Sequence, residues 1–245
     1  MPTLNCNNFR AFLKCLEPIG DDLVFQFVPT GIEVKAMGGG ASQLLNVKMH
    51  MDPGFVGVLG FSLEMFKKLL PKELEEVDIA FGTQTVITGV GFKSTVASIN
   101  EGTCAHVPKK DIPINPGAIR VDAQKMFERI TALKSAFNGS AFDLNLDANK
   151  PTTVEFADFD SAMGSMNNSI ATLTPVTITD RQIIPYDVVL PILNVVRNLT
   201  EGIDLRFADM PNDKDCKALV IEGVVPFKDT PIYFQYVIAP RVKDV

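Results

Sequence analysis

The residues that most clearly indicate a binding chemistry are basic side chains, which recur on four segments with helical periodicity. Arg10 and Lys14, like Lys125 and Arg129, are four residues apart, so each pair shares one helix face. Cations on such a face bind phosphates without reading base sequence. We therefore predict a phosphate-binding face formed by eight residues, with ordinary solvation of exposed helix faces as the alternative. The eight are Arg10, Lys14, Lys67, Lys68, Lys125, Arg129, Lys134 and Arg197.

The distribution of charge along the chain supports this interpretation. Ranges 7–17, 62–70, 123–136 and 186–198 together contain eight basic and four acidic residues, a balance of +4. The whole chain of 245 residues has 29 acidic and 23 basic residues and a net charge of −6, which leaves −10 for the remainder. An acidic protein as a whole repels nucleic acid. A DNA-facing surface must therefore be local, and the four segments are its predicted location.

Other residue types give weaker indications of chemistry. The "MGGGAS" stretch at 37–42 lacks the Lys-Ser or Lys-Thr of a phosphate-binding loop and opens no helix, so we interpret it as a turn. His50 and His106 stand in no nucleophile or metal motif. An enzyme that uses aspartates such as Asp143, Asp158 and Asp160 with a metal or phosphate is a second hypothesis. Turnover or a bound metal would support it, whereas our first expectation is no catalysis, no cofactor and no metal.

The cysteines indicate ordinary reduced thiols. They form no CxxC pair and are too sparse for a disulfide framework or a zinc site. They stand at Cys6, Cys15, Cys104 and Cys216. The chain has no run of 18 apolar residues and its start does not resemble a signal peptide, so we expect an intracellular protein without membrane association.

The elements that must position these side chains alternate between helices and strands, which predicts an α+β fold. Residues 7–17, 62–72, 122–137 and 186–198 have helical periodicity. Asn7, Asn8 and Ser62 are candidate helix caps. Each helix precedes three alternating segments that we predict to be strands. They are 22–28, 31–37 and 43–51; 76–82, 83–90 and 92–99; 141–147, 152–158 and 167–173; and 202–209, 218–223 and 232–239.

These four helix-plus-strands units are an internal repeat that divides the chain into two similar halves. Phe66 to Phe81 and Ile192 to Phe207 both span 15 residues, and both spans close on matching ends, "VDIAF" and "IDLRF". Between the halves, "HVPKKDIPINPG" has three prolines and suits an exposed, semi-rigid connector. We predict domains at 1–105 and 117–245 joined by a loop at 106–116. The loop is a linker in one interpretation and a binding element in the other.

Several motifs, taken in order, resemble the proliferating cell nuclear antigen (PCNA) type of DNA sliding clamp along nearly the whole chain. "FRAFLKCLEPIGDDLVFQFVPTGIEVKAM" is similar to the first helix and strands of that family. "DIPINP" resembles its interdomain connecting loop, and "YVIAPRV" resembles its closing strand. The resemblance implies a trimeric ring of two-domain chains, with helices lining the hole and strands outside. The ring would contain this chain alone or with paralogues.

The resemblance also implies a hydrophobic pocket beneath the connecting loop that takes short peptide motifs. The matching positions are Met37, Leu44, Ile112, Pro113, Ala239 and Pro240. Ordinary core packing is the alternative for each, and the favoured one for Leu44. Two departures bear on partner choice. "GGGAS" follows Met37 where the family has an aspartate and a histidine, and Val237 replaces an aromatic residue.

The implied partners are double-stranded DNA, which the eight basic residues of the helices would bind, and, through peptide motifs, DNA polymerase, clamp loader, flap nuclease and ligase. The implied roles are in DNA replication and DNA repair. A clamp-like scaffold that does not load onto DNA is a further alternative. The implied compartment is the nucleus in a eukaryote, the cytoplasm in an archaeon or the host cell for a virus. We expect segments 94–100 and 167–173 to be edge strands that pair between neighbouring subunits.

Overall fold

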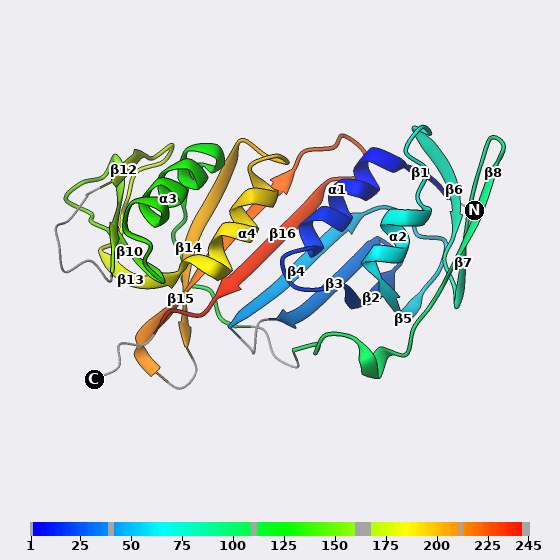
Figure 1. Ribbon diagram of the computed structural model, residues 1–245, viewed down its shortest axis with the longest axis horizontal. Coiled ribbons are helices and arrows are strands. Elements are labelled where there is room, and N and C mark those ends of the chain that lie inside the picture. Colours follow the sequence, from blue (N-terminus) through cyan, green and yellow to red (C-terminus); the bar gives the residue numbers. More distant parts are fainter. Residues whose placement is uncertain (1, 39–41, 109–111, 160–167, 211–212, 242–245) are drawn as a thin grey trace. The chain divides into compact units, whose positions relative to one another are not determined.

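The computed structural model describes residues 2–38, 42–108, 112–159, 168–210 and 213–241. The chain forms two compact units (Figure 1). The first comprises Met1–Lys109 with Val224–Phe234, and the second comprises Lys110–Gly223 with Gln235–Val245. The unit boundary thus lies within the predicted connecting loop, and Val224–Phe234 returns to the first unit. The predicted domain limits stay a prediction.

The described residues contain four α-helices at the predicted places. They are α1 (Cys6–Leu16), α2 (Leu63–Leu69), α3 (Ala123–Phe137) and α4 (Tyr186–Val196). The predicted apolar stripes are buried, as Phe9 and Phe12 in α1 and Met126 and Ile130 in α3 show. The helices therefore form because one face of each packs inward, which leaves the opposite face for polar and charged residues. No helix in this part of the chain is long and apolar enough to span a lipid bilayer.

The strands of the first unit form two antiparallel sheets. One has the order β1-β6-β7-β8, and β5-β2-β3-β4 are consecutive neighbours in the other. Their bounds are β1 (Thr3–Asn5), β2 (Asp22–Val28), β3 (Gly31–Gly38), β4 (Gln43–His50), β5 (Gly57–Ser62), β6 (Glu76–Ala80), β7 (Gln84–Gly89) and β8 (Phe92–Ala97).

The second unit repeats this arrangement. One sheet has the order β12-β11-β10-β13, and β15-β14-β9 are consecutive neighbours in the other. The bounds are β9 (Ile119–Asp122), β10 (Ala141–Leu146), β11 (Thr153–Asp158), β12 (Asn168–Ala171), β13 (Asp180–Pro185), β14 (Gly202–Met210), β15 (Asp213–Val225) and β16 (Ile232–Ile238). The α+β fold predicted from the sequence is confirmed, and strands β9 to β15 pair antiparallel.

Each repeat has one strand more than the sequence pattern predicts. β1, β5, β9 and β13 each lie directly before a helix, so the unit is strand, helix and three strands. Each of these leading strands pairs with the strand that directly follows the helix of the other repeat in its unit. The pairs are β1 with β6, β5 with β2, β9 with β14 and β13 with β10. The two repeats of a unit are thus held together by an exchange of their leading strands.

The leading strands also place the helix N-caps. Asn5, at the end of β1, accepts hydrogen bonds from the backbone N–H groups of Asn7 and Asn8. The capping role predicted for Asn7 and Asn8 is therefore wrong, because they donate to the cap. Ser62 occupies the N-cap position of α2 but makes no side-chain capping hydrogen bond. In α3 the cap is Asp122, which accepts from the backbone N–H of Lys125 at 2.8 Å.

Aromatic packing fills the core of the first unit between helices and sheets. Phe9 of α1 lies edge-on to Phe66 of α2, with ring centroids 5.5 Å apart. Phe25 of β2 packs against Phe66 and Phe61, with centroids 6.0 and 5.5 Å away. In the second unit the corresponding contact joins Phe142 and Tyr186 at 5.2 Å. These cores fix the helices, and with them the basic side chains on their outer faces.

Candidate nucleic-acid interface and partner groove

Basic side chains gather in a hollow between α1 and α2 of the first unit. The hollow has a volume of about 380 Å³ and is lined by Arg10, Leu13, Lys14, Glu17, Lys67 and Lys72. Four cations face one carboxylate there, so the hollow attracts anions. Lys72 was not among the predicted cations because the counted range 62–70 ends at the start of the "LPK" turn that follows α2. Its proximity to "KKLL" on the preceding helix is the signal that could have found it.

Three of the eight predicted cations, all in this unit, are held by contacts within the chain. Arg10 donates to the backbone carbonyl of Pro71 and to Asn7 Oδ1, the latter at 2.9 Å. Lys67 forms an ion pair with Glu17 at 2.8 Å, and Lys68 pairs with Glu64 at 2.6 Å. The hydrogen bond from Lys68 lowers the pKa of the Glu64 carboxyl below its ordinary value. These exposed pairs contribute little to stability and can exchange for phosphate contacts.

The α3 and α4 helices of the second unit carry the other predicted cations. Lys125 and Arg129 are exposed on α3, and Lys134 is half-buried in its last turn. Arg197, the C-cap residue of α4, lies over the ring of Phe127 with its guanidinium carbon 3.9 Å from the ring centroid. It also donates to Asn194 and Gln124. Arg197 therefore joins α4 to α3 and is less available to a ligand than predicted.

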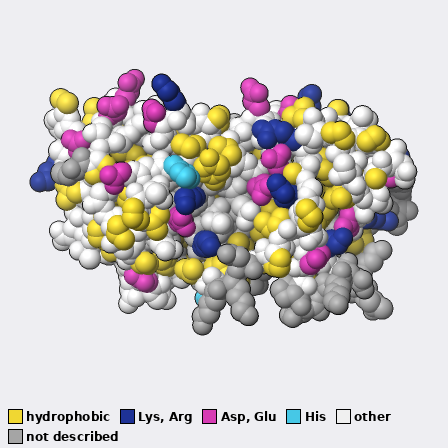
Figure 2. Space-filling model, turned by 180° about the vertical axis from the view of Figure 1, so that it is seen from behind, with side chains coloured by type: hydrophobic (Ala, Val, Ile, Leu, Met, Phe, Trp, Pro, Cys, Tyr) yellow, Lys and Arg dark blue, Asp and Glu magenta, His cyan; other side chains and the backbone are white. Residues whose placement is uncertain are grey.

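A division into paired and unpaired cations follows. Within the described residues, Lys14, Lys125, Arg129 and Lys134 have no ion pair. The face drawn in Figure 2 has side chains of both charge signs among hydrophobic ones. The unpaired cations of the helices are thus the most direct candidates for phosphate contacts. Whether they bind DNA stays a prediction.

The predicted peptide groove draws on residues from both units. Met37 and Leu44 of the first unit are opposite each other on β3 and β4, and both are half-buried. Leu44 points to the face opposite that of Leu45, which is fully buried. The interpretation of Leu44 as core is therefore wrong. In the second unit Ile112, Ala239 and Pro240 are half-buried and Pro113 is exposed. The groove that would combine the two sets stays a prediction.

The backbone of the connecting loop is hydrogen-bonded to each unit on either side of residues 109–111, which lie outside the described residues. In the first unit the backbone N–H of Met37 donates to the carbonyl of His106 at 2.8 Å. In the second unit the backbone N–H of Asn115 donates to the carbonyl of Phe207 at 2.8 Å, and Ile114 forms a β-bridge with Ala208. The loop therefore leaves each unit from a fixed point.

Both segments predicted as intersubunit edges are edge strands in their sheets. β8 ends the order β1-β6-β7-β8, and β12 begins the order β12-β11-β10-β13. Exposed apolar side chains accompany them: Val90 in the turn before β8, Met65 on α2 and Leu173 after β12. Unpaired edges flanked by exposed apolar residues are typical of strands that pair with another chain.

The residues proposed for an enzyme lie in separate structural contacts. Asp143 is buried and receives two hydrogen bonds from Arg181, at 3.1 and 2.6 Å. Asp158 accepts from the Tyr186 hydroxyl at 3.2 Å. The His50 ring faces Tyr233, and Asp160 lies outside the described residues. The described side chains bring together no group of three or more metal ligands.

Two units with the same helices, sheets and exchange of leading strands define the architecture of a PCNA-type clamp. Among solved structures, the chain is similar to a crystal structure of the PCNA2–PCNA3 complex from Sulfolobus tokodaii. The TM-score is 0.70 and the sequence identity 13%, and the match covers 98% of this chain and 98% of that chain. The fold is therefore that of a PCNA-type clamp subunit. No protein-family model and no curated protein sequence matches the chain.

Proposed function

We propose that this chain is a subunit of a DNA sliding clamp, a processivity factor that encircles duplex DNA and tethers replication and repair enzymes to it. The observation that carries the proposal is the clamp fold, which extends over 98% of both chains in the comparison. The basic helices, the open edge strands and the anchored connecting loop support it. In this role the chain acts by binding and enclosure, without catalysis or a cofactor.

The helices would contact DNA weakly and without sequence preference. Lys14, Lys125 and Arg129 are exposed and carry flexible charged side chains. Such side chains bind phosphates by releasing counterions, a contribution that every position along a duplex offers equally. Weak, uniform contacts hold a ring on DNA and still let it slide.

The ring would close through β8 of one subunit and β12 of the next. These strands belong to different units and have different sequences, so the contact is head-to-tail and closes when the rotation between subunits is right. The neighbour is a second copy or a paralogue, and the PCNA2–PCNA3 structure is an example of the latter arrangement. Three subunits of two units each would complete the ring.

Partner enzymes would bind by short peptides beside the connecting loop. The proposed contacts are Met37, Leu44, Ile112, Pro113, Ala239 and Pro240. Enzymes tethered in this way remain near the DNA because the enclosed duplex raises their effective concentration. A polymerase, a clamp loader, a flap nuclease and a ligase are the proposed users of this groove.

Retention on a topologically closed DNA tests the proposal without a clamp loader. The purified chain is incubated with linear duplex DNA carrying biotin at both ends, which are then blocked with streptavidin. We expect the protein to stay with the blocked duplex through a high-salt wash and to leave after a restriction enzyme cuts it. Equal loss before and after the cut would refute the clamp function and favour a scaffold that does not enclose DNA. Mass measurement in solution would show whether this chain alone forms a trimer.

A further inference from the structure

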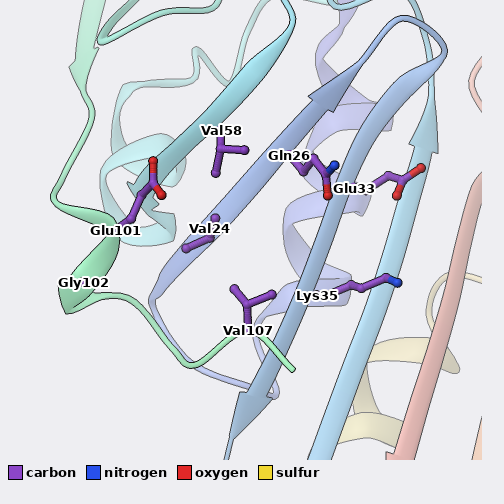
Figure 3. Close-up of a pocket in the computed structure, with 8 residues that line it drawn as sticks. All are labelled: Val24, Gln26, Glu33, Lys35, Val58, Glu101, Gly102 and Val107. Atoms are coloured by element: carbon purple, nitrogen blue, oxygen red, sulfur yellow. The ribbon is translucent and has the colours of Figure 1, made fainter. Parts of the chain in front are cut away.

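A groove on the strand face of the first unit has no part in the proposed DNA or peptide sites. Its volume is about 470 Å³ (Figure 3). β2, β3 and β5 form one side, and the segment that leads into the connecting loop forms the other. The lining residues are Val24, Gln26, Glu33, Lys35, Val58, Glu101, Gly102 and Val107.

The outer wall of the groove is fixed before any ligand arrives. The backbone N–H of Ile99 donates to Gly60 of β5 at 2.8 Å, and that of Ala105 donates to Asp22 of β2 at 2.9 Å. Between them, Glu101–Thr103 forms a 3₁₀ turn, with the Asn100 side chain accepting from the backbone N–H of Gly102. A wall held at both ends needs little ordering on binding, which favours affinity.

Close packing of the wall depends on the glycine in β5. A Cβ atom at Gly60 would stand 2.8 Å from Cys104 Sγ and 2.8 Å from the carbonyl oxygen of Ile99. Both distances are shorter than real Cβ contacts, so a side chain at this position would push the wall away from β5. The glycine therefore lets the segment lie directly against the sheet edge.

Three valines give the groove an apolar centre. Val24 from β2, Val58 from β5 and Val107 from the wall surround the same space (Figure 3). Val58 is 44% exposed and Val107 38% exposed, although valine is usually buried. Contact with an aliphatic side chain of a partner would remove this apolar surface from water.

The end of the groove near Glu101 is acidic. Asp22 lies on the same face of β2 as Val24, because side chains alternate along a strand. Glu101 lines the groove, and the backbone carbonyl of Asp22 accepts a hydrogen bond from Ala105 of the same wall, so both acidic residues flank this end. Within the described residues neither carboxylate forms an ion pair. Glu33 is paired with Lys48 at 2.6 Å, and Lys35 interacts within the chain.

We infer that this groove docks an extended segment of a partner protein in which an aliphatic residue stands beside a lysine or arginine. The aliphatic side chain packs among the three valines, and the cation faces Glu101 and Asp22. An apolar contact flanked by a complementary charge gives both affinity and a choice of partner. The surface lies within one unit, so it requires neither DNA enclosure nor the connecting-loop groove.

An NMR titration of the full chain with methyl-labelled valine tests the inference. The probe is a synthetic five-residue peptide, acetylated and amidated, with a central leucine between two lysines. We expect the methyl signals of Val24, Val58 and Val107 to shift with millimolar saturation, and the same peptide with glutamates in place of lysines to cause no shift. Equal shifts with both peptides, or no shift at these valines with the lysine peptide, would overturn the inference.

Matched variants separate docking from nonspecific attraction. Val58→Thr keeps the shape of an exposed side chain but makes it polar, and Glu101→Gln removes one carboxylate charge. Each should weaken the lysine peptide about threefold to tenfold. The controls Val90→Thr and Glu73→Gln make the same changes at exposed positions of this unit that do not line the groove, and should leave binding unchanged. Unchanged binding in both groove variants would likewise overturn the inference.

Discussion

Proline substitution at the two open edge strands offers a sharp test of how subunits meet. In antiparallel sheets the N–H groups of successive residues point to opposite sides of a strand. The N–H of Ser98 donates to Thr83 on the β7 side at 2.8 Å, so the N–H of Ala97 faces the open edge of β8. Ala97→Pro therefore removes a donor from the outer side and leaves the pairing with β7 in place.

The same geometry selects a different residue on β12 from the one that its sequence suggests. From "NNSIATL" alone, Ile170 is an equally good site for proline. Ile170 is buried, however, and the N–H of Thr172 donates to Thr152 at 2.9 Å, so the N–H of Ile170 faces β11. Ile170→Pro would damage the core and the unit's own sheet. Ala171 faces away from β11, but the bridge between Thr172 and Val121 places it beside β9. The outward, exposed position is Ser169, and Ser169→Pro is the matching test.

The expected effect is a large loss of association with little loss of folding. One missing hydrogen bond costs about 0.5–1.5 kcal/mol, and the proline ring also displaces the neighbouring pairs. A total of about 2–4 kcal/mol weakens each subunit contact roughly 30- to 1000-fold. Sedimentation velocity should show monomers for Ala97→Pro and Ser169→Pro at concentrations where the parent chain and the control Ala97→Val are assembled. The circular dichroism spectrum should not change. Parent-like assembly in both proline variants would refute pairing through these edges.

Three further predictions concern DNA, the connecting loop and a buried thiol. Alanine at the unpaired cations Lys14, Lys125 and Arg129 should make the slope of log affinity for DNA against log salt shallower by up to about 2.7 per chain, whereas Lys68→Ala, which removes an ion-paired lysine, should change it less. If Lys68→Ala made this slope shallower by more than the three alanine substitutions together, the division into paired and unpaired cations would be contradicted. Ile112→Asp should abolish calorimetric binding of a clamp-interacting peptide, with Ile112→Val as the control and the melting temperature nearly unchanged, because it places a charge in an apolar groove; retained binding would show that the loop is only a linker. Burial raises the pKa of the Cys15 thiol to about 12, so at pH 8 it should resist a thiol-reactive disulfide reagent until denaturant is added, and rapid labelling of Cys15 in the folded protein would contradict its burial.

Periodicity predicted the four helices and the strands that follow them because each buries one regular stripe of side chains. The leading strands escaped prediction for physical reasons. β1 has only three residues, β5 contains two glycines and β13 ends in proline, so none has a long alternating pattern. Their stability comes from partners in another repeat, and single-sequence patterns do not carry such distant pairings.

The candidate sites, like the fold, were predicted from the sequence only in part. The sequence indicates which helices carry cations, because side chains four residues apart share a face. It does not show that Lys67 pairs with Glu17 of another helix or that Arg197 lies on Phe127, since both contacts depend on tertiary packing. The groove of Figure 3 was also missed. Val58 and Val107 belong to segments that lie side by side only because the chain after β8 returns to the edge of β5.

The treatment of sheet edges explains why β8 and β12 are the strands left for assembly. The chain leaving β8 covers the edge of β5 through the bridge between Gly60 and Ile99, and the chain leaving β12 covers the edge of β9 through Val121 and Thr172. β1 is too short to be an extended template. The outer edge of β13 is partly covered by the chain after β16, because the backbone N–H of Arg241 donates to the carbonyl of Ile183 at 2.9 Å. Because the two open edges differ in sequence, each contact can be matched independently, so the two neighbours of this chain in the proposed ring can be different paralogues, each fitted to one of its edges.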